Sequence, residues 1–254
     1  MRVEKLGSGE PEYAVVACLH GDEPCGRKAI ERFLASNREV EKAVKLIVAN
    51  EKALEQDKRY IDVDLNRCFP GDPESSRHEE KLAADLTDEV EGMTVLDLHS
   101  TRSYSGVLVA NSKVNEERIK LAKAAGVEKI AHLALEDVDC MEERVKTVSV
   151  ECGLQKSEKA GENALEVIKN FLGYFGVINH DYHVSEPEVF RTFETVRKGD
   201  YTFTAENFRK VEQGEVYAKK GEKELEAEEP FYPVLMSTDG YEEILGHKAR
   251  KMDM

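Results

Sequence analysis

The sequence predicts an α/β fold, in which helices cover both faces of a sheet, followed by a small β-rich C-terminal domain. Two patterns predict this organisation. Short apolar runs alternate with segments of helical apolar spacing up to about residue 186. Beyond Pro187, short alternating runs punctuated by glycines replace them. We therefore expect an α/β domain over residues 1–186 and a β-rich domain over residues 187–254.

The first elements form a strand, a tight turn and a helix. Residues 13–19 are rich in valine and alanine, which is typical of a buried strand. Pro24 follows at a position that favours the first turn of a helix, and the apolar residues after it recur at helical spacing. These residues are Ala29, Ile30, Phe33 and Leu34. Residues 44–49 predict a second strand.

The later elements continue the alternation. Residues 79–90 predict a helix, with Ser75 and Ser76 as candidate caps and Gly92 after its end. The remaining apolar runs predict strands over 93–98, 106–110 and 147–150, and helices over 114–125 and 160–175. This alternation implies a sheet with helices on both faces.

Charge and composition exclude several classes of partner. The chain has 36 basic and 51 acidic residues, a net charge of −15, which argues against a nucleic-acid partner. No apolar stretch reaches the roughly 20 residues of a membrane helix, and the first residues lack the apolar segment of a signal peptide. We therefore expect a cytoplasmic protein without membrane contact. The five cysteines form no C-x-x-C pair, which predicts reduced thiols. The oligomeric state is left open, a homo-oligomer included.

The first candidate site is His20-Gly21-Asp22-Glu23-Pro24, between the first predicted strand and helix. Ligands of open α/β sheets gather at this edge. His20 and Glu23 are three residues apart, so both side chains can reach one ion, and imidazole and carboxylate are ligands that zinc accepts. Gly21 allows a sharp backbone turn beside them.

The second candidate site is Asp97-Leu98-His99-Ser100, where another histidine ends an apolar strand. Two histidines and a glutamate form a three-ligand set that leaves a fourth position for water, as in catalytic zinc sites. The set requires the imidazoles of His20 and His99 to lie within about 7 Å of each other. Asp97 is either a partner that orients the metal set or a side chain turned away by the alternation of the strand.

The third candidate site is the stretch from Arg59 to Arg67, R-Y-I-D-V-D-L-N-R. Its two arginines and its asparagine can bind a substrate carboxylate and an oxygen that becomes negative during a reaction. The same residue types equally suit a charged loop in which the arginines pair with Asp62 and Asp64.

The order of five motifs resembles one family. H-G-D-E-P, R-Y-x-D-x-D-L-N-R, D-L-H-S, V-E-C-G and the late Tyr232-Pro233-Val234 together resemble the succinylglutamate desuccinylase and aspartoacylase family, a branch of the zinc carboxypeptidase superfamily. The resemblance runs from about Val15 to about Tyr241. It implies a mixed, mostly parallel sheet of the zinc carboxypeptidase type. It also implies a zinc-dependent amidohydrolase that releases the acyl group from a small anionic N-acyl amino acid.

The resemblance implies roles for individual residues. His20, Glu23 and His99 would hold one zinc ion per chain. Glu151 would be the catalytic glutamate, and Arg59 would polarise the scissile carbonyl. The sequence pattern independently places Glu151 after the strand predicted over 147–150, at the same sheet edge as the histidines. A buried acid there can take a proton from a zinc-bound water and pass it to the leaving amine.

The substrate residues follow from the same resemblance. Asn66 and Arg67 match the pair that grips a substrate carboxylate, and Tyr241 matches a tyrosine that reaches back to the substrate. Two departures leave the acyl specificity undetermined. Cys-Gly follows Glu151 where Gly-Pro is more typical, and the segment before it is short. The arginine that reads the acyl side chain in aspartoacylase has only Arg144 as a counterpart.

Alternatives remain open at this point. A zinc carboxypeptidase that acts on short peptides shares the ligands and the Asn-Arg pair, and a zinc-binding protein without turnover shares the ligands. His180 and His183 could hold a second metal, although we favour a domain-linking loop. Residues 214–222 resemble a biotinyl or lipoyl-type half-barrel but lack its modified lysine sequence, so we expect the C-terminal domain to cap the site.

Overall fold

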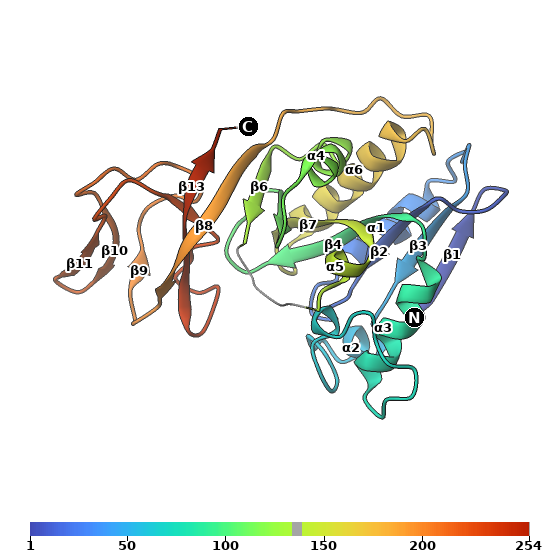
Figure 1. Ribbon diagram of the computed structural model, residues 1–254, viewed down its shortest axis with the longest axis horizontal. Coiled ribbons are helices and arrows are strands. Elements are labelled where there is room, and N and C mark those ends of the chain that lie inside the picture. The colour runs from blue at the N-terminus through green and yellow to red at the C-terminus, as the bar shows by residue number, and fades with distance from the viewer. Residues whose placement is uncertain (134–138, 254) are drawn as a thin grey trace.

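A long mixed sheet runs through the protein (Figure 1). The structure, a computed structural model, describes residues 1–133 and 139–253. Within these residues the sheet has ten strands in the order β1-β3-β2-β4-β7-β5-β6-β8-β13-β12. The strands are β1 (Arg2–Leu6), β2 (Tyr13–Ala17), β3 (Val44–Val48), β4 (Thr94–Thr101), β5 (Leu108–Asn111), β6 (Lys129–His132), β7 (Lys146–Leu154), β8 (Glu188–Arg197), β12 (Tyr232–Val234) and β13 (Ile244–Met252).

The sheet is mostly parallel at its centre. β3, β2, β4 and β7 pair in parallel, as do β5, β6 and β8. β1 with β3, β5 with β7, and β8, β13 and β12 in succession pair antiparallel. The predicted mixed, mostly parallel sheet is therefore confirmed. Because β2, β4 and β7 run in the same direction, their carboxyl ends meet at one edge of the sheet.

Helices cover both faces of the sheet, as predicted. α1 (Cys25–Ala35), α4 (Glu116–Ala124) and α6 (Glu158–Tyr174) pack on one face, where Phe33 and Phe171 are buried in the larger apolar core. α3 (His78–Glu89), α5 (Met141–Arg144) and the 3₁₀ turn η1 (Leu65–Arg67) cover the other face, where Leu82 and Leu86 are buried. Each such side chain contributes about 1.5–3 kcal/mol through burial. The short helix α2 (Glu51–Glu55) follows β3.

Several element boundaries differ from the prediction. α3 begins at His78 after Arg77, and neither predicted serine caps it. The Ser75 hydroxyl instead accepts a hydrogen bond from the backbone N–H of Arg77 and contacts the Glu80 carboxylate. β7 continues through Leu154, beyond the predicted end at residue 150, because it pairs with β4 on one side and β5 on the other. β1 and β6 were not predicted.

The C-terminal part contributes to two sheets. β8, β13 and β12 extend the long sheet, and β8 pairs with β6 of the first part. β9 (Thr202–Phe203), β10 (Val216–Lys220) and β11 (Lys223–Glu226) form a separate antiparallel sheet at the opposite end of the molecule from β1 (Figure 1). The predicted β-rich C-terminal part is present, and the domain boundary at 186/187 stays a prediction.

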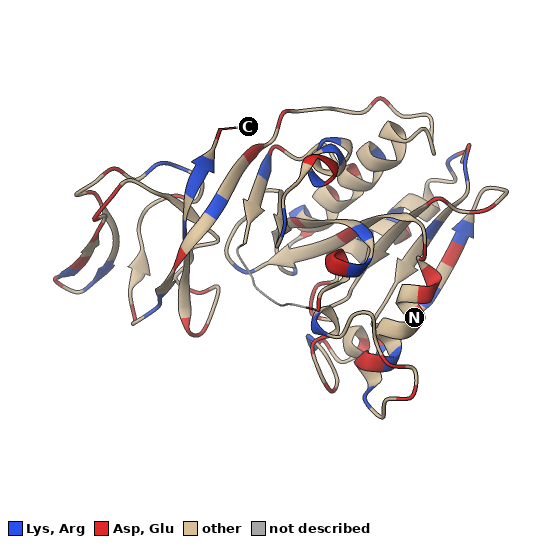
Figure 2. Ribbon diagram, viewed as in Figure 1, with Lys and Arg blue, Asp and Glu red and all other residues tan. Residues whose placement is uncertain are grey.

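Two features bear on contact with a bilayer or a polyanion: the composition of the described helices and the distribution of the charges. Among the described helices, none combines the length and the apolar composition that a membrane span needs. Acidic and basic residues are interspersed over the whole ribbon in Figure 2 rather than gathered in one region. The predicted absence of a nucleic-acid partner remains an expectation from the net charge of −15.

Candidate active site

Two neighbouring strands place four polar side chains in one block. β4 and β7 run in parallel, with His99 opposite Glu151 and Asp97 opposite Ser149. Residues two apart on a strand point to the same face, and Val95, two residues before Asp97, is buried under α3. All four side chains therefore lie on the face that carries α3 and α5. Strand register alone brings Glu151 beside the histidine.

A tight loop between β2 and α1 supplies the other two predicted ligands. β2 ends at Ala17 and α1 begins at Cys25, so His20 and Glu23 lie in the loop rather than at the ends of the two elements. Gly21 packs against α2, where an added Cβ would lie 2.1 Å from the carbonyl carbon of Ala53. Glycine is needed here for close backbone approach, which holds the loop against α2.

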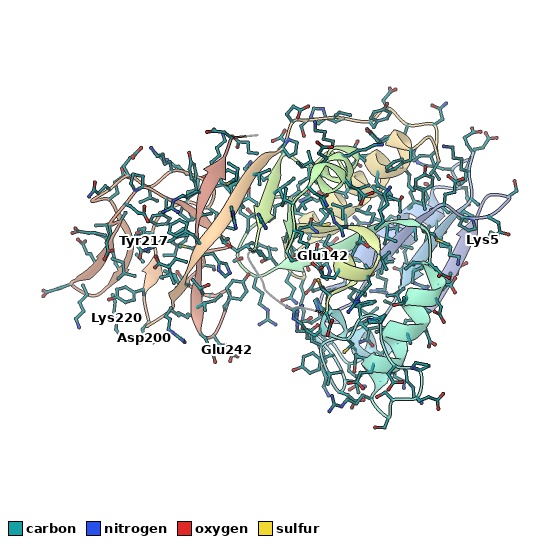
Figure 3. All side chains as sticks on the ribbon, viewed as in Figure 1. Lys5, Glu142, Asp200, Tyr217, Lys220 and Glu242 are labelled. Carbon is teal, nitrogen blue, oxygen red and sulfur yellow. The ribbon has the colours of Figure 1, made fainter. Side chains whose placement is uncertain are left out.

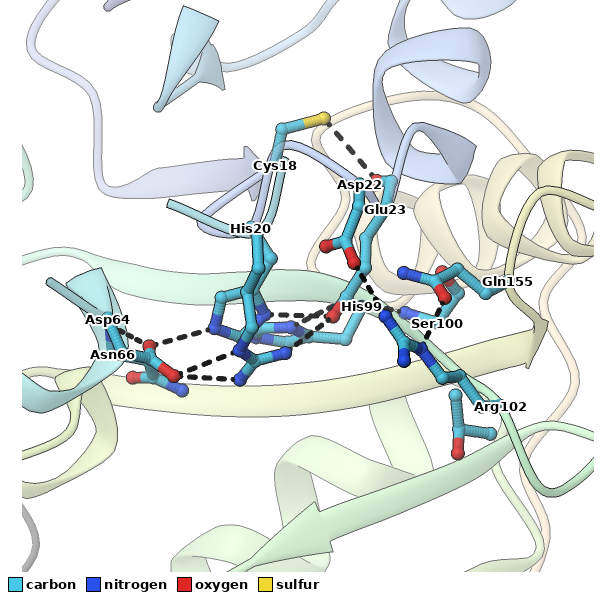
Figure 4. Close-up of polar contacts among 12 residues, drawn as sticks. Cys18, His20, Asp22, Glu23, Asp64, Asn66, His99, Ser100, Arg102 and Gln155 are labelled. Atoms are coloured by element: carbon cyan, nitrogen blue, oxygen red, sulfur yellow. Dashed lines mark hydrogen bonds and ion pairs between the residues drawn. The ribbon is translucent and has the colours of Figure 1, made fainter. Parts of the chain in front are cut away.

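His20, Glu23 and His99 converge (Figure 4). The Nδ1 atom of His20 lies 2.9 Å from Glu23 Oε1, and Nδ1 of His99 lies 3.1 Å from Glu23 Oε2. The two ring centroids are 5.1 Å apart, inside the limit of about 7 Å that a shared ion sets. One potential ligand atom from each residue lies within 4.8 Å of the others, and all three residues are buried.

The chemistry of this group fits a transition-metal ion. In each histidine one ring nitrogen faces Glu23, and the other forms a hydrogen bond with a second carboxylate. Nε2 of His20 donates to Asp64 Oδ1 at 3.0 Å, and Nε2 of His99 donates to Asp97 Oδ2 at 2.7 Å. Carboxylates on the outer nitrogens fix the tautomer and the ring orientation of metal-binding histidines. Asp97 is therefore not turned away from His99, and its role in orienting a metal set stays a prediction.

The charges in the group balance one another. Burial would raise the pKa of Glu23, but His20 and His99 bring it well below its usual value. Burial would lower the pKa of His99, but Asp97 and Glu23 raise it well above its usual value. The group is therefore a buried carboxylate between two imidazoles that stabilise its charge, and a divalent cation bound there could take over this role.

Asp64 ties the stretch 59–67 to His20. Besides the His20 ring, its carboxylate accepts hydrogen bonds from Nε of Arg59 at 3.0 Å and from the backbone N–H of Asn66 at 2.9 Å. Arg59 Nη1 also reaches Glu23 Oε1 at 3.3 Å. The arginine thus pairs with an acid of its own loop, as one reading of the sequence expected, and that pairing holds its guanidinium beside the candidate metal group.

Asn66 and Arg67 lie on η1 and have hydrogen-bond donors that no described residue accepts. The Asn66 Oδ1 atom accepts a hydrogen bond from the backbone N–H of Met141 at 3.1 Å, which leaves its amide NH₂ available. Arg67 donates to the backbone oxygen of Asn66 at 2.7 Å and forms no ion pair within the described residues. Both residues line the same cavity as His20 and His99.

Glu151 has the environment of a proton-transfer group. Burial and the charge of Glu23 raise its pKa to about 7, against the opposing effect of His99. Its Oε2 atom is buried and has no hydrogen-bond partner in the described part of the chain. A carboxyl whose pKa lies near neutrality can both accept and give a proton at physiological pH.

A cavity of about 600 Å³ contains these groups, a size that suits a small-molecule site. The C-terminal part forms one of its walls, through Leu235, Gly240, Tyr241, Glu242, Ile244 and His247. The Tyr241 hydroxyl lies 3.2 Å from Ser103 Oγ and 3.4 Å from Thr101 Oγ1, just past the end of β4. The structure therefore brings eight of the predicted site residues to one cavity: His20, Glu23, Arg59, Asn66, Arg67, His99, Glu151 and Tyr241.

Arg144 is the predicted site residue that lies elsewhere. Its guanidinium pairs with Asp139 at 3.2 Å, the side chain is about half exposed, and it does not line the cavity. His180 and His183 follow α6 and belong to neither group of potential metal ligands found among the described residues. The second such group, Cys140, Glu142 and Glu143, surrounds the start of α5.

Sequence reasoning missed a clamp at the cavity. Arg102 donates to Asp22 Oδ2 at 3.1 Å and to Gln155 Oε1 at 2.9 Å, on the side of the metal group away from Asn66 (Figure 4). It joins the loop before α1 to the ends of β4 and β7. Arg102 lies two residues after the D-L-H-S motif, and this arginine so close to a motif was the available signal.

The fold and this group of residues define the class of the protein: an α/β protein with a candidate metal centre at the carboxyl edge of its parallel strands. Residues 10–172 match the family model of the succinylglutamate desuccinylase/aspartoacylase catalytic domain. The chain belongs to this family, as its motifs predicted.

Individual relatives agree with this assignment. The chain is 30% identical over 126 residues to a probable aspartoacylase of Acaryochloris marina and 29% identical over 126 residues to one of Trichodesmium erythraeum. These matches cover 45% and 44% of this chain but only 42% of the length of each relative.

Solved structures share the fold over nearly the whole chain. A succinylglutamate desuccinylase/aspartoacylase from Rhodobacter sphaeroides superposes with a TM-score of 0.78 at 19% identity, over 99% of this chain and 89% of that one. Murine aminoacylase 3 superposes with a TM-score of 0.69 at 19% identity, over 96% of this chain and 97% of that one. At such identities the likeness concerns the fold.

Proposed function

We propose that this protein is a zinc-dependent hydrolase that releases the acyl group from a small N-acyl amino acid. The observation that carries the proposal is the convergence of two histidine Nδ1 atoms on the Glu23 carboxylate, with Glu151 opposite His99 on the next strand. Membership of the succinylglutamate desuccinylase/aspartoacylase family supports the same reaction class.

His20, Glu23 and His99 would hold the zinc ion. A zinc ion bound there would polarise the acyl carbonyl and lower the pKa of a water molecule. Asp64 and Asp97 keep both imidazoles oriented through their outer nitrogens. Arg59 lies beside Glu23 with its guanidinium on the cavity, where it would stabilise negative charge on the carbonyl oxygen.

Glu151 would move the proton. Its free Oε2 atom and its pKa of about 7 suit it to accept a proton from the attacking water and to give it to the leaving amine. The leaving amine must be protonated because an amide anion is a poor leaving group. His99, directly opposite on β4, keeps the carboxyl within reach of the metal group.

Asn66 and Arg67 would bind the α-carboxylate of the substrate. Arg67 has no acidic partner among the described residues. Asn66 uses its Oδ1 atom to accept from Met141, so its NH₂ group can donate to a ligand. A bidentate arginine contact with a carboxylate is strong and geometrically selective. An anionic N-acyl amino acid is the expected ligand, despite the net charge of −15.

A carboxypeptidase acting on short peptides remains the alternative reaction. Tyr241 and its neighbours line the cavity, and its volume of about 600 Å³ suits a small molecule, so we favour the small substrate. The same lining residues support the predicted role of the C-terminal part as a cap over the site.

The decisive experiment replaces one atom of the proton-transfer group. Glu151→Gln should retain one zinc per chain by metal analysis and lose about 100- to 10,000-fold in kcat. The assay measures release of free amino acids from a panel of N-acyl amino acids, with short peptides in parallel. Near-normal turnover by the zinc-loaded variant would remove Glu151 from this role, and hydrolysis confined to peptides would favour the alternative.

A further inference from the structure

One end of the cavity has a polar lining that the proposed reaction does not use. Beyond Asn66, the wall is formed by Ser112 after β5, by Cys140 and Glu142 around the start of α5, and by Ser149 of β7. We call these four residues the α5 subsite. Figure 3 labels Glu142 on α5, near the middle of the molecule in that view.

The α5 subsite lies next to the residues proposed to bind the α-carboxylate. The backbone N–H of Met141 donates to Asn66 Oδ1 at 3.1 Å, and Glu142 is the next residue along α5. In an amino acid the side chain leaves the same carbon atom as the α-carboxylate. A substrate held at Asn66 and Arg67 therefore has its side chain close to these residues, and the α5 subsite adjoins Asn66.

The α5 subsite contains a carboxylate and no cation. Among the described residues, the arginines that line the cavity are Arg59, Arg67 and Arg102, and no lysine lines it. Arg59 and Arg102 are paired with acids near the metal group. Arg144, in the same helix as Glu142, pairs with Asp139 outside the cavity. Residues 134–138 have the sequence Ala-Leu-Glu-Asp-Val, which contains no lysine or arginine.

Glu142 has one satisfied and one unsatisfied oxygen. Its Oε1 atom accepts a hydrogen bond from the backbone N–H of Ser112 at 2.6 Å, which fixes the carboxyl at the wall. Its Oε2 atom is buried and has no partner within the described chain. Arg118 donates to the backbone oxygens of Glu142 and Val145 rather than to the carboxylate.

A buried amide next to the α5 subsite is also without partners. Asn111 is 1% exposed and lines the cavity, and neither its Oδ1 nor its Nδ2 atom is hydrogen-bonded in the described part of the chain. Buried polar atoms without partners are rare and need an explanation. A ligand that donates hydrogen bonds would satisfy the carboxylate oxygen. The Ser112 and Ser149 hydroxyls donate to Glu143 and Asp97, so each can still accept a hydrogen bond from such a ligand.

We infer that the α5 subsite selects N-acyl amino acids whose side chain donates hydrogen bonds, an amide or an ammonium group, over those whose side chain is a carboxylate. The inference rests on the proposed deacylase function. Glu142 is the specificity-determining residue. A substrate carboxylate at the α5 subsite would face the Glu142 carboxylate, which repels it. Arg118, the cation that contacts the backbone of Glu142, does not line the cavity and so is not available to bind that carboxylate.

The test compares substrates of equal shape. Nα-acetyl-L-glutamine and Nα-acetyl-L-glutamate differ only in the terminal amide or carboxylate, and Nα-acetyl-L-ornithine adds a cation. For the zinc-loaded wild-type protein, kcat/KM should be about 10- to 100-fold higher for the glutamine and ornithine derivatives than for the glutamate derivative. A preference for the glutamate derivative would overturn the inference and leave the deacylase function intact.

Glu142→Gln tests the residue itself. The substitution keeps the shape and removes the charge, so the preference for the ornithine derivative over the glutamate derivative should fall about 10-fold or more. Glu117→Gln is the matched control: it removes an exposed carboxylate of α4 that pairs with Lys146, and neither residue lines the cavity. An unchanged preference in a folded Glu142→Gln protein would overturn the assignment of Glu142.

A binding measurement separates the two proposals. Isothermal titration of the zinc-loaded wild-type protein with free ornithine, glutamine and glutamate reports on the α5 subsite without turnover. If none of the N-acetyl compounds is hydrolysed but the binding order holds, the deacylase proposal fails, and only the side-chain selectivity of the α5 subsite stands. If glutamate binds as tightly as the other two, the inference fails whatever the turnover. The order of the ligands is measured on the wild-type protein alone, so this test of the inference does not depend on whether the Glu142→Gln protein folds.

Discussion

Two carboxylates determine how the histidines are presented to an ion. Asp97 accepts a hydrogen bond from His99 and Asp64 accepts one from His20, each at the nitrogen that faces away from Glu23. Asp97 is fully buried, and its second oxygen has no partner among the described residues. A carboxylate in such a place costs desolvation energy, which its hold on the histidine offsets.

Asp97→Asn should therefore weaken zinc binding while the fold is retained. The neutral amide no longer raises the basicity of the His99 ring, so we expect a zinc affinity about 10- to 100-fold lower. Competition with a chromophoric chelator measures the affinity. Asp85→Asn makes the same change at an exposed position of α3 and should leave the zinc affinity unaltered. Equal affinities for both variants and the wild type would exclude an orienting role for Asp97.

The stretch that carries Arg59 and Asp64 is organised by one residue of α3. The buried Glu79 carboxylate accepts hydrogen bonds from the backbone N–H groups of Ile61, Asp62 and Val63, at 2.7, 2.9 and 3.2 Å. It also accepts one from the Asn50 side chain at 3.0 Å. A segment without helix or strand hydrogen bonds is thereby held in one conformation next to the metal group.

Glu79→Gln should destabilise the protein in a pH-dependent way. Burial would raise the pKa of Glu79, but the backbone donors lower it below its usual value of 4.5. A depressed pKa means that the ionised carboxylate favours folding above about pH 4.5, and that this contribution is lost as the pH falls through the folded-state pKa. We expect Glu79→Gln to lose about 1–3 kcal/mol in free energy of unfolding at pH 7, with a smaller difference from the wild type below pH 4.

Urea denaturation at several pH values measures this difference. Glu80→Gln, on the next residue of α3, changes a carboxylate that pairs with Arg77 at the surface, so its effect should be under about 1 kcal/mol. A Glu79→Gln loss that does not shrink at low pH would show that the ionised carboxylate is not its source.

The loop between β2 and α1 depends on a glycine. An alanine at position 21 would place its Cβ 2.2 Å from the backbone nitrogen of Leu54 and 2.1 Å from the carbonyl carbon of Ala53, so α2 or the loop must move. We expect Gly21→Ala to lose about 1–3 kcal/mol of stability and to bind less zinc, because His20 is the preceding residue.

Gly161 of α6 provides the control for this substitution. An added Cβ there finds its nearest neighbour at 3.7 Å, an ordinary contact, so Gly161→Ala should be neutral or stabilising by up to about 1 kcal/mol. Thermal unfolding and metal analysis of both variants make the comparison. Full zinc content in Gly21→Ala would show that the loop tolerates the displacement.

An aromatic cluster joins the C-terminal part to the long sheet. Phe190 of β8 is 1% exposed, and its ring centroid lies 5.1 Å from that of Phe208 and 5.2 Å from that of Tyr232. The same cluster includes Leu108 of β5, next to the cavity. The wall that carries Tyr241 is thus attached to the sheet through buried aromatic contacts.

Phe190→Ala should cost about 3–5 kcal/mol of unfolding free energy, because it leaves a cavity among packed rings. Phe193→Ala is the control on the same strand, since Phe193 is 37% exposed and contacts mainly Arg250. Chemical denaturation followed by circular dichroism measures both. Equal losses would mean that the cluster does not hold the two parts together.

Much of the fold and of the candidate site could be predicted because the signals are local. Apolar runs marked β2, β3, β4 and β7, and each histidine motif directly follows or ends such a run. β1 and β6 escaped prediction because their mixed polar residues, Arg2–Leu6 and Lys129–His132, show no clear periodicity. The serine caps of α3 failed because Ser75 bonds the Glu80 side chain and the N–H of Arg77 instead.

The sequence determined which chemical groups the protein has and where along each element they stand, because apolar periodicity and short motifs are properties of neighbouring residues. Only the tertiary structure decided that Asp64 faces His20, that Arg144 turns to Asp139 and that Glu142 lines the cavity. These outcomes depend on strand order and register between segments far apart in the chain. Local patterns carry little information about either, since any two strands can pair in several registers.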